Sequence, residues 1–449
     1  MATHAEPRSV GGASKQRHGG SARDPQNSAR NPGRRLLQLL GPGLITGAAD
    51  DDPTGIATYA QAGAQSGYKL LWTCLLTVPM MMAVQYTAAK VAVVHGKGLT
   101  DVLKSRYPKA LASGAVLALL IANLINAGSD IGAIGAAFAL VLPIPAKVMI
   151  IPVVAALFFF LTFGNYDLIQ NTFKWLCLAL LAYIVASFLA HPSLGDILRG
   201  TFIPTISLNP AFLALLVAAL GGNISPYLLF WQADMEVDDS QQSQRAREPT
   251  ARLRRRMIGR ELKAVALDTN IGMIFSNVII FFVEVSTAAT LFQSGNGNIS
   301  SAAQAAEALR PLLGPAATIT WSVGMLGAAL LAVPALTASA SDAVAALFGW
   351  PHGLNDSPRR AKRFYVVLGA ALGIGVAINF IGINPIQALV AAAVVNGIIT
   401  PPLLALLLLI ANRKDVMGER TNGRGINIVG WATVAIMSLA ALGFLLTTF

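Results

Sequence analysis

The chain has 449 residues, of which 54% are hydrophobic and only 12% are charged. This composition excludes an ordinary soluble protein and is typical of a chain with many membrane-spanning helices, each of which uses about 20 mainly apolar residues. The formal charge of +11 does not indicate a nucleic-acid partner, because no soluble domain is available to gather the basic residues on one face. Cys74 and Cys177 both lie in apolar stretches, so neither a disulfide framework nor a thiolate metal site is expected.

The first 34 residues differ from the rest of the chain. Residues 1–34 are rich in Ser, Gly, Pro, Asn and Arg and contain no apolar run, so they are predicted to form a disordered cytoplasmic tail. They show no cleavable signal peptide, because their charged region never meets a short apolar segment. Residues 35–449 are predicted to form one all-α transmembrane domain.

From Leu36 onward, apolar segments alternate with short polar loops and predict eleven membrane-spanning helices. Their approximate ranges are 36–65, 70–94, 111–142, 148–163, 173–190, 210–231, 264–292, 314–347, 364–382, 385–411 and 426–448.

The basic residues predict how these spans are oriented. If the N-terminus is cytoplasmic, all of the 33 Lys and Arg residues except Lys69, Lys147, Arg199 and Arg310 fall on the cytoplasmic side. Such an excess of positive charge marks cytoplasmic loops. The sequence therefore predicts a multi-pass protein of the cell inner membrane whose C-terminus lies on the opposite side.

The first predicted span carries polar residues in its middle. Asp50, Asp51 and Asp52 are followed by Pro53 and Gly55, although carboxylates at membrane depth are costly and Pro frees backbone groups that need other partners. A helix broken around a cavity would resolve both problems. The alternative is a surface loop between two shorter segments, but each flanking run is too short to span a bilayer alone.

The sixth predicted span has a second interruption, at Gly221, Gly222, Asn223, Ser225 and Pro226. Taken alone, either break is as readily explained by a structural kink. Their matched positions are typical of a transporter built from inverted repeats, with its substrate bound near the midplane between the two breaks. The repeats are expected at about 36–190 and 210–411, with an extra helix at about 426–448.

The side chains at the two breaks offer oxygen atoms. Asp52 has a carboxylate, Thr54 and Ser225 have hydroxyls, Asn223 has an amide, and the unwound backbone near Gly222 has carbonyls. Oxygen donors suit hard cations such as Mg²⁺, Mn²⁺ or Ca²⁺, whereas sulfur or imidazole ligands suit softer metals. The breaks contain no Cys or Met, and none of the five His residues falls in the middle of a span.

A further carboxylate is expected near this site. Asp130, in the third span, shares a helical face with Asn123 and Asn126, as expected of a cavity lining, although a packing cluster of hydrogen bonds is the alternative. Asp51 is included as a candidate metal ligand, and Asp50, Asp51 and Asp130 together would make the cavity potential negative. The sequence alone does not show which of the three consecutive aspartates faces the ion.

Three stretches resemble the NRAMP family of divalent-metal transporters. "GPGLITGAADDDPTGIATYAQAGAQSGYKLLW" is similar to the first helix of that family, "GGNISPYLLFWQA" to the sixth, and "ITPPLLALLLLIANRKDVMG" to the end of the tenth. The resemblance extends over nearly the whole chain after the tail. It implies the LeuT-type 5+5 inverted-repeat fold, with broken helices 1 and 6, and transport by alternating access.

In the first helix, the resemblance departs from the family's Asp-Pro-Gly-Asn motif. Asp52 and Pro53 match, but Thr54 takes the place of the Gly and Gly55 takes that of the ligand Asn. The smaller residue would enlarge the site.

In the sixth helix, the Met-Pro-His motif of the family is also altered. Ser225 replaces the Met ligand, Tyr227 replaces the His, and Gln232 replaces a second His further along. The resemblance puts a backbone-carbonyl ligand at Gly222. Without the thioether, the site is expected to be larger and harder, as in the NRAMP-related magnesium transporters, which suits a partly hydrated Mg²⁺. Asp130 would hold the ion through water. Because both histidines are absent, proton coupling is left open.

The leading hypothesis is a transporter that imports a hard divalent cation, most simply Mg²⁺ with Mn²⁺ second, and neither enzyme activity nor a resident cofactor is expected. Its expected partners are the ion and the lipid bilayer, and the oligomeric state is left open. An organic-cation or amino-acid transporter on the same fold is the alternative. A membrane metalloenzyme or metal sensor is the third hypothesis, but the expected extra ligands and output domain are missing. The candidate metal-site residues are Asp52, Thr54, Gly222, Ser225, Asp130, Asn223 and Asp51.

Overall fold

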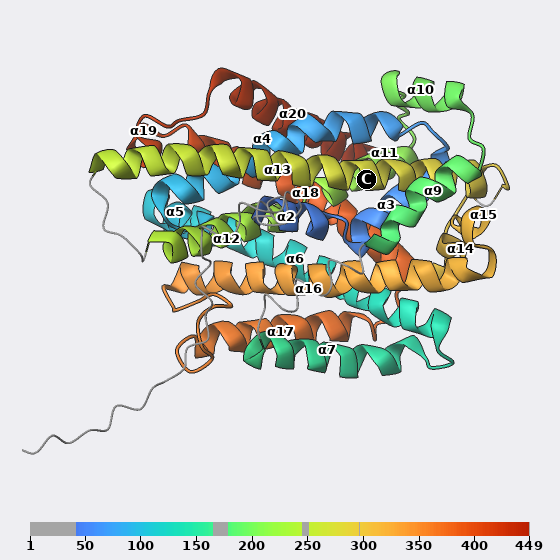
Figure 1. The fold of residues 1–449 in the computed structure, drawn as a ribbon, viewed down its shortest axis with the longest axis horizontal. Helices are drawn as coiled ribbons and strands as arrows, with labels where there is room; N and C mark the ends of the chain where they lie inside the picture. Colours follow the sequence, from blue (N-terminus) through green and yellow to red (C-terminus); the bar gives the residue numbers. More distant parts are fainter. Residues whose placement is uncertain (1–41, 165–177, 245–250, 296, 449) are drawn as a thin grey trace, which may run out of the picture. The chain divides into compact units, whose positions relative to one another are not determined.

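A computed structural model describes residues 42–164, 178–244, 251–295 and 297–448, and this part of the chain is helical with no β-strand (Figure 1). The tail predicted at 1–34 lies outside the described residues. The α-helices are α2 (Pro42–Asp50), α3 (Pro53–Ser66), α4 (Leu71–His95), α5 (Leu99–Arg106), α6 (Lys109–Val141), α7 (Ala146–Phe163), α9 (Ala182–Leu189), α10 (Leu194–Phe202), α11 (Pro210–Asn223), α12 (Pro226–Gln244), α13 (Ala251–Thr287), α14 (Ala302–Glu307), α15 (Arg310–Leu313), α16 (Ala317–Phe348), α17 (Lys362–Ile378), α18 (Pro385–Ala411), α19 (Lys414–Met417) and α20 (Arg424–Thr448).

The predicted spans correspond to helices of the structure, the fifth only in part because residues 165–177 lie outside the described range. Among the described residues, eight helical segments are long and apolar enough to cross a membrane. The first predicted span is not among them because it is divided into α2 and α3, and the ninth because α17 has only 17 residues. Short helices in the loops, such as α5, α10 and α14, were not expected from the apolar pattern.

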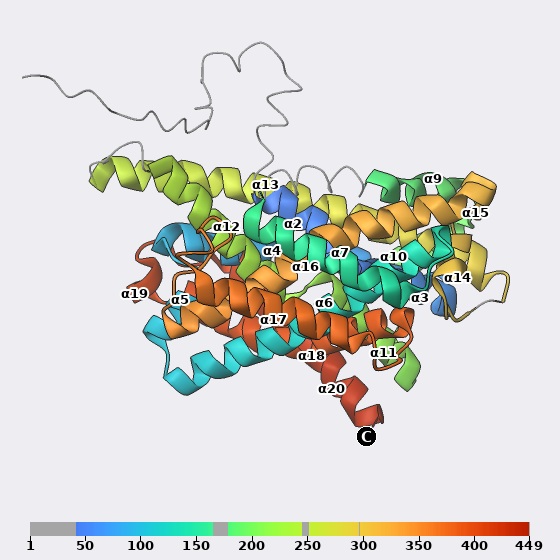
Figure 2. The same cartoon turned by 90° about the horizontal axis from the view of Figure 1, so that it is seen from below.

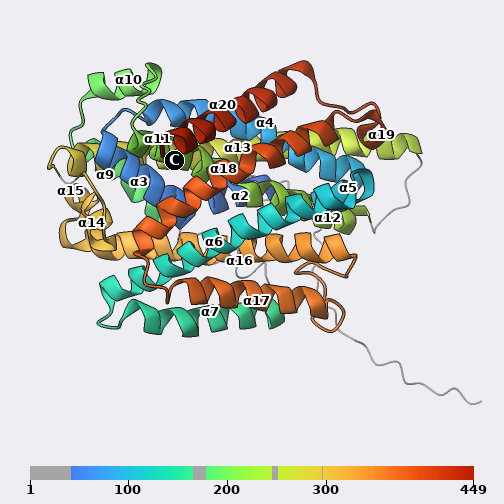
Figure 3. The same cartoon turned by 180° about the vertical axis from the view of Figure 1, so that it is seen from behind.

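The helices form layers on either side of the two broken spans. Helices α6 and α16 pack along each other, and α7 and α17 cover their outer side (Figures 1 and 3). On the opposite side lie α4 and α13, and the halves α2, α3 and α12 lie between the two layers. Helix α20 packs on α11 and α18 and extends beyond them to the C-terminal end, as Figure 2 shows. The broken helices are therefore enclosed by other helices.

Both interruptions occur where the sequence predicted them. Helix α2 ends at Asp50, and α3 begins at Pro53 after the N-cap residue Asp52. Helix α11 ends at Asn223, and α12 begins at Pro226. Proline has no N–H to donate, so it fits the first position of a helix, where that N–H would have no partner within the helix. The predicted all-α fold with broken first and sixth helices is confirmed, and the surface-loop alternative is wrong because the three aspartates are buried.

Helix α2 is held closely against α13. A Cβ atom on Gly47 would lie only 2.4 Å from the carbonyl oxygen of Gly272, so the two backbones touch where neither residue has a side chain. At the start of α2, the N–H of Gly43 donates to Asp268 Oδ2 at 2.7 Å and satisfies one of the donors that a helix N-terminus leaves open. This packing fixes α2, and hence the start of the first break.

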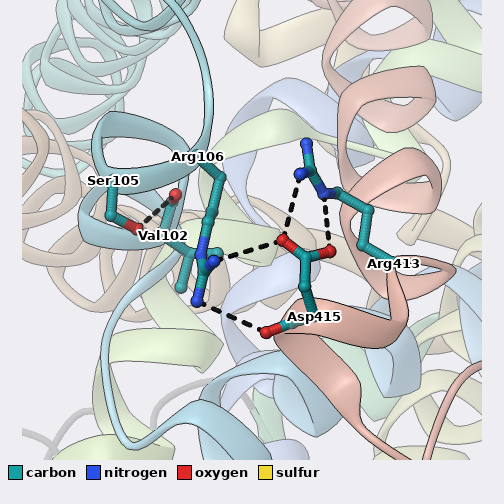
Figure 4. Close-up of polar contacts among 5 residues, drawn as sticks. All are labelled: Val102, Ser105, Arg106, Arg413 and Asp415. Atoms are coloured by element: carbon teal, nitrogen blue, oxygen red, sulfur yellow. Dashed lines mark hydrogen bonds and ion pairs between the residues drawn. The ribbon is translucent and has the colours of Figure 1, made fainter.

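The loops at the end of the bundle that carries α5 and α19 are joined by ion pairs (Figure 4). Asp415 accepts from Arg413 through both carboxylate oxygens at 3.0 Å, and Arg106 Nη1 lies 3.1 Å from its Oδ2. These three side chains are partly exposed, so the contacts position the loops and add little stability.

Candidate metal site at the two helix breaks

Asp52 lies at the centre of the first break and caps α3. Its Oδ1 accepts from the N–H of Gly55 at 2.7 Å, and its Oδ2 accepts from Asn126 Nδ2 at 3.3 Å. The residue is only 1% exposed. Because the N-terminus of a helix carries a partial positive charge, α3 stabilises an anion at this position. Asp52 is therefore a carboxylate that the fold can keep charged inside the membrane domain.

Helix α6 brings a second carboxylate close to the break. The hydroxyl of Thr54 donates to Asp130 Oδ1 at 2.9 Å and lies 3.3 Å from Ser129 Oγ. Asp130 Oδ2 is buried and has no hydrogen-bond partner. Thr54 thus links the Asp130 carboxylate to the first turn of α3, and one oxygen of Asp130 is available to a ligand or a water molecule.

The two breaks face each other through glycines. A Cβ atom on Gly55 would lie 3.4 Å from Asp52 Oδ1 and 3.7 Å from the carbonyl oxygen of Gly222. The space beside Asp52 is therefore bounded by the backbone of the second break, and the carbonyl of Gly222 is the nearest neutral oxygen from that side. Any larger residue at position 55 would occupy part of this space.

Ser225 is tied to its own helix in this conformation. Its hydroxyl donates to the carbonyl oxygen of Gly221 at 3.0 Å and to that of Gly222 at 3.2 Å. These carbonyls lose their helical partners at the break, so the hydroxyl satisfies groups that would otherwise be buried without a donor. The lone pairs of Ser225 Oγ remain available as acceptors.

Tyr227 joins the two breaks, and the sequence analysis did not include it among the site residues. Its hydroxyl donates to the carbonyl oxygen of Ala49 at 2.8 Å and lies 3.4 Å from Asp52 Oδ2. Ala49 is in the last turn of α2, whereas Tyr227 is in the first turn of α12. The one signal that could have found this residue is its place directly after Ser225 and Pro226 in the altered sixth-helix motif.

The other two aspartates of the run face a different helix. Ser276 Oγ on α13 lies 2.5 Å from Asp50 Oδ2 and 3.0 Å from Asp51 Oδ1. Both carboxylates lie at the C-terminal end of α2, where the helix dipole does not favour an anion. Although Asp51 and Asp52 are consecutive, their side chains have different hydrogen-bond partners. No sequence pattern indicated Ser276.

Asn223 also points away from Asp52. Its Nδ2 donates to Thr77 Oγ1 at 2.5 Å on α4 and to Asn277 Oδ1 at 3.0 Å on α13. Further along α12, Gln232 Nε2 donates to Thr269 Oγ1 at 2.8 Å. Of the seven candidate metal-site residues, the structure gathers Asp52, Thr54, Asp130 and Gly222 at the break, with Ser225 bound to the Gly222 carbonyl. Of the remaining two, Asn223 contacts α4 and α13, and Asp51 contacts α13.

The gathered residues are closed off from solvent. Each of the polar candidates is buried, so an ion can reach or leave Asp52 only after the surrounding helices move. Within the part of the chain that the structure describes, no group of three or more His, Cys, Asp or Glu side chains is arranged to hold a metal ion. The arrangement can therefore supply one or two carboxylates and neutral oxygens, but not a complete shell of charged ligands.

Comparison with known proteins identifies relatives along almost the whole chain. A family model described as natural resistance-associated macrophage protein-like, or Nramp, matches residues 43–447. The chain is 27% identical over 422 residues to the divalent metal cation transporter MntH of Deinococcus radiodurans, with 92% of this chain and 90% of that protein covered. It is 25% identical over 426 residues to the protein of the same name from Bacillus subtilis, with 92% of each covered.

Solved structures show the same fold at lower identity. A manganese transporter of Eremococcus coleocola, in complex with an aromatic bis-isothiourea substituted compound, superposes with a TM-score of 0.70 at 18% identity, covering 91% of this chain and 86% of that one. Mhp1, in an inward-facing conformation, gives a TM-score of 0.52 at 13% identity, with 91% and 92% covered. The fold is accordingly the LeuT-type inverted repeat, with α2/α3 and α11/α12 as its broken helices.

Proposed function

The chain belongs to the NRAMP family and is a multi-pass membrane transporter of divalent metal cations, and from that membership we propose that it imports Mg²⁺, with Mn²⁺ as second substrate, by alternating access. The relatives that match over nine-tenths of the chain are named divalent metal cation transporters, so the alternative of an organic-cation or amino-acid carrier is not favoured. A role as a membrane enzyme has no support from these relatives either.

The observation that carries the choice of ion is the donor set beside Asp52. Asp52 is contacted by the N–H of Gly55, the amide of Asn126 and the hydroxyl of Tyr227, none of which is a sulfur or imidazole group, and Gly55 has no side chain that would lie between Asp52 and the Gly222 carbonyl. Mg²⁺ prefers oxygen ligands and gives up its water reluctantly, so it suits a site with few protein ligands and room for water. A soft metal would gain nothing from this set.

We assign roles to the site residues on this basis. Asp52 is the principal anionic ligand, the Gly222 carbonyl and the Thr54 and Ser225 hydroxyls contact the ion or its water shell, and Asp130 acts through water. Asn223 and Asp51 join this set only if the helices rearrange, because in this conformation they face α4 and α13.

The direction and orientation form part of the proposal. With the N-terminus in the cytoplasm of a bacterial-type cell, the basic loops lie on the cytoplasmic side of the inner membrane and the C-terminus lies on the opposite side. The ion would enter from the side where α3 ends and leave from the side where α2 begins. The two repeats whose relative movement would open the site to one side of the membrane and then to the other are about 36–190 and 210–411.

Uptake into proteoliposomes tests the proposal. Mg²⁺, Mn²⁺ and Ca²⁺ uptake should be compared for the wild type, Asp52→Asn, and Asp415→Asn as the matched control at an exposed carboxylate. Asp52→Asn is expected to lower Mg²⁺ uptake by about tenfold or more, because losing a contact to a charged group is worth about 1.5–3 kcal/mol. Mn²⁺ uptake without Mg²⁺ uptake would refute the choice of ion, and unchanged uptake in Asp52→Asn would refute the site.

A further inference from the structure

Helix α10 is a short helix outside the predicted spans, between α9 and α11. It runs from Leu194 to Phe202 and begins at the N-cap residue Ser193, whose hydroxyl accepts from the N–H of Asp196 at 3.3 Å. In Figure 1 it stands at the edge of the bundle, near the ends of α4, α9 and α11. The surface of this helix divides lengthwise into three faces.

One face of α10 packs on the protein. Gly200 is buried, and a Cβ atom at this position would lie 2.1 Å from the carbonyl oxygen of Tyr68. Ile197 and Thr201, which lie three residues before and one after it, are half-buried beside this contact. Tyr68 belongs to the turn between α3 and α4. The glycine therefore lets α10 lie directly against the turn that follows the second half of the first broken helix.

A second face is apolar and uncovered. Leu194, Leu198 and Phe202 recur at intervals of four residues and so share one face of the helix. Their exposed fractions are 71%, 58% and 66%. The third face carries the exposed residues Asp196 and Arg199. An isolated helix in water would not keep three large apolar side chains on one side and its charges on another without a matching environment.

The surface around α10 indicates what covers the apolar face. Helix α9, which precedes it, exposes Val185, Phe188 and Leu189, and the segment that follows exposes Ile206 and Leu208. In a membrane protein, such side chains face the acyl chains of lipids. The segments on either side of α10 in the chain thus also expose large apolar side chains of the kind that contact lipid, whereas the charges of α10 lie on a different face of the helix.

We propose that α10 contacts the bilayer where α3 ends and α11 begins, with Leu194, Leu198 and Phe202 inserted among the lipid acyl chains. Its packing on Tyr68 then ties the end of α3 to the membrane surface. Because the chain continues from α10 into α11, the outer halves of both broken helices are attached to one lipid-anchored element. This inference does not depend on which ion is transported.

Spin labelling of the full-length protein in liposomes of phosphatidylethanolamine and phosphatidylglycerol tests the proposal. Cys74 and Cys177, the latter outside the described residues, are first replaced by Ala. Single cysteines are then introduced as Leu198→Cys and Phe202→Cys on the apolar face and as Arg199→Cys on the charged face, and their collision rates with oxygen and with the water-soluble NiEDDA are measured. Leu446→Cys, at an exposed position on α20, gives the lipid-facing reference.

The expected result is a high oxygen and low NiEDDA collision rate at positions 198 and 202, as at 446, and the reverse at 199. NiEDDA access at 198 and 202 equal to that at 199 would overturn the proposal, because the face would then lie in water. Exclusion of both reagents from 198 and 202 would also overturn it, because a protein surface, such as a second copy of the chain, would then cover the face. Leu194→Cys replaces either variant that does not keep the unfolding temperature of the parent.

Discussion

Removing the hydroxyl of Tyr227 tests whether the two helix breaks act as one site. In Tyr227→Phe, the carbonyl oxygen of Ala49 loses its donor at 2.8 Å, and Asp52 Oδ2 loses a neighbouring hydroxyl at 3.4 Å. A buried acceptor left without a partner costs about 1–3 kcal/mol, and about 1.4 kcal/mol corresponds to a tenfold change in an equilibrium constant. We expect the closed conformation to be destabilised by this amount and the apparent Mg²⁺ affinity to change by about five- to 140-fold.

The matched control for this variant is Tyr59→Phe. The hydroxyl of Tyr59 is also buried and donates to a backbone carbonyl, that of Ala219, at 3.1 Å, but it has no contact with Asp52. Both variants should lower the thermal unfolding temperature of the purified protein, measured by intrinsic fluorescence. Only Tyr227→Phe should also change the concentration dependence of Mg²⁺ uptake into proteoliposomes. Equal uptake curves for the two variants would refute the argument that Tyr227 links the breaks at the ion site.

Three further predictions follow from other parts of the structure. Gly55→Asn should lower Mg²⁺ uptake more than Mn²⁺ uptake in a competition assay, because the new side chain fills the space beside Asp52 that we assign to water, and an unchanged ratio would contradict that assignment. The hydrogen bond that His352 Nδ1 donates to Asp342 Oδ1 at 3.2 Å raises the pKa of His352 from 6.5 to about 9, so the stability contributed by this pair is fully present below pH 6.5 and is lost as the pH rises through about 9. Unfolding temperatures measured from pH 6 to 10 should show this loss in the wild type but not in His352→Gln, and parallel curves would refute the pairing. Arg106→Ala removes one partly exposed ion pair and should change the free energy of unfolding by less than about 1 kcal/mol, as denaturant titration would show, and a larger loss would mean that this pair holds the loops together.

The sequence by itself was sufficient to predict the helices and the positions of the breaks. Membrane-spanning helices need long apolar runs, and both breaks fall where a Pro follows polar or Gly residues within such a run, so the spans and the breaks at Pro53 and Pro226 are local properties of the chain. Pro alone does not mark a break, because Pro79, Pro152 and Pro334 lie inside continuous helices. The same local reasoning marked the three consecutive aspartates at 50–52, because carboxylates within an apolar run need a special environment, but it did not show which of them faces the ion. The short helix α10 escaped this reasoning because its apolar residues recur at intervals of four and form no continuous run.

Only the tertiary structure decided which side chains meet. Asp51 and Asp52 are consecutive, but the backbone between α2 and α3 is not helical, so one faces Ser276 and the other caps α3. Likewise, the amide of Asn223 is directed to Thr77 by helices that are distant in the sequence. The hydroxyl of Tyr227 reaches the first break for the same reason. Side-chain direction at a break depends on the packing of neighbouring helices, which no short stretch of sequence encodes, whereas the tendency to break is encoded locally by polar and Gly residues together with a Pro.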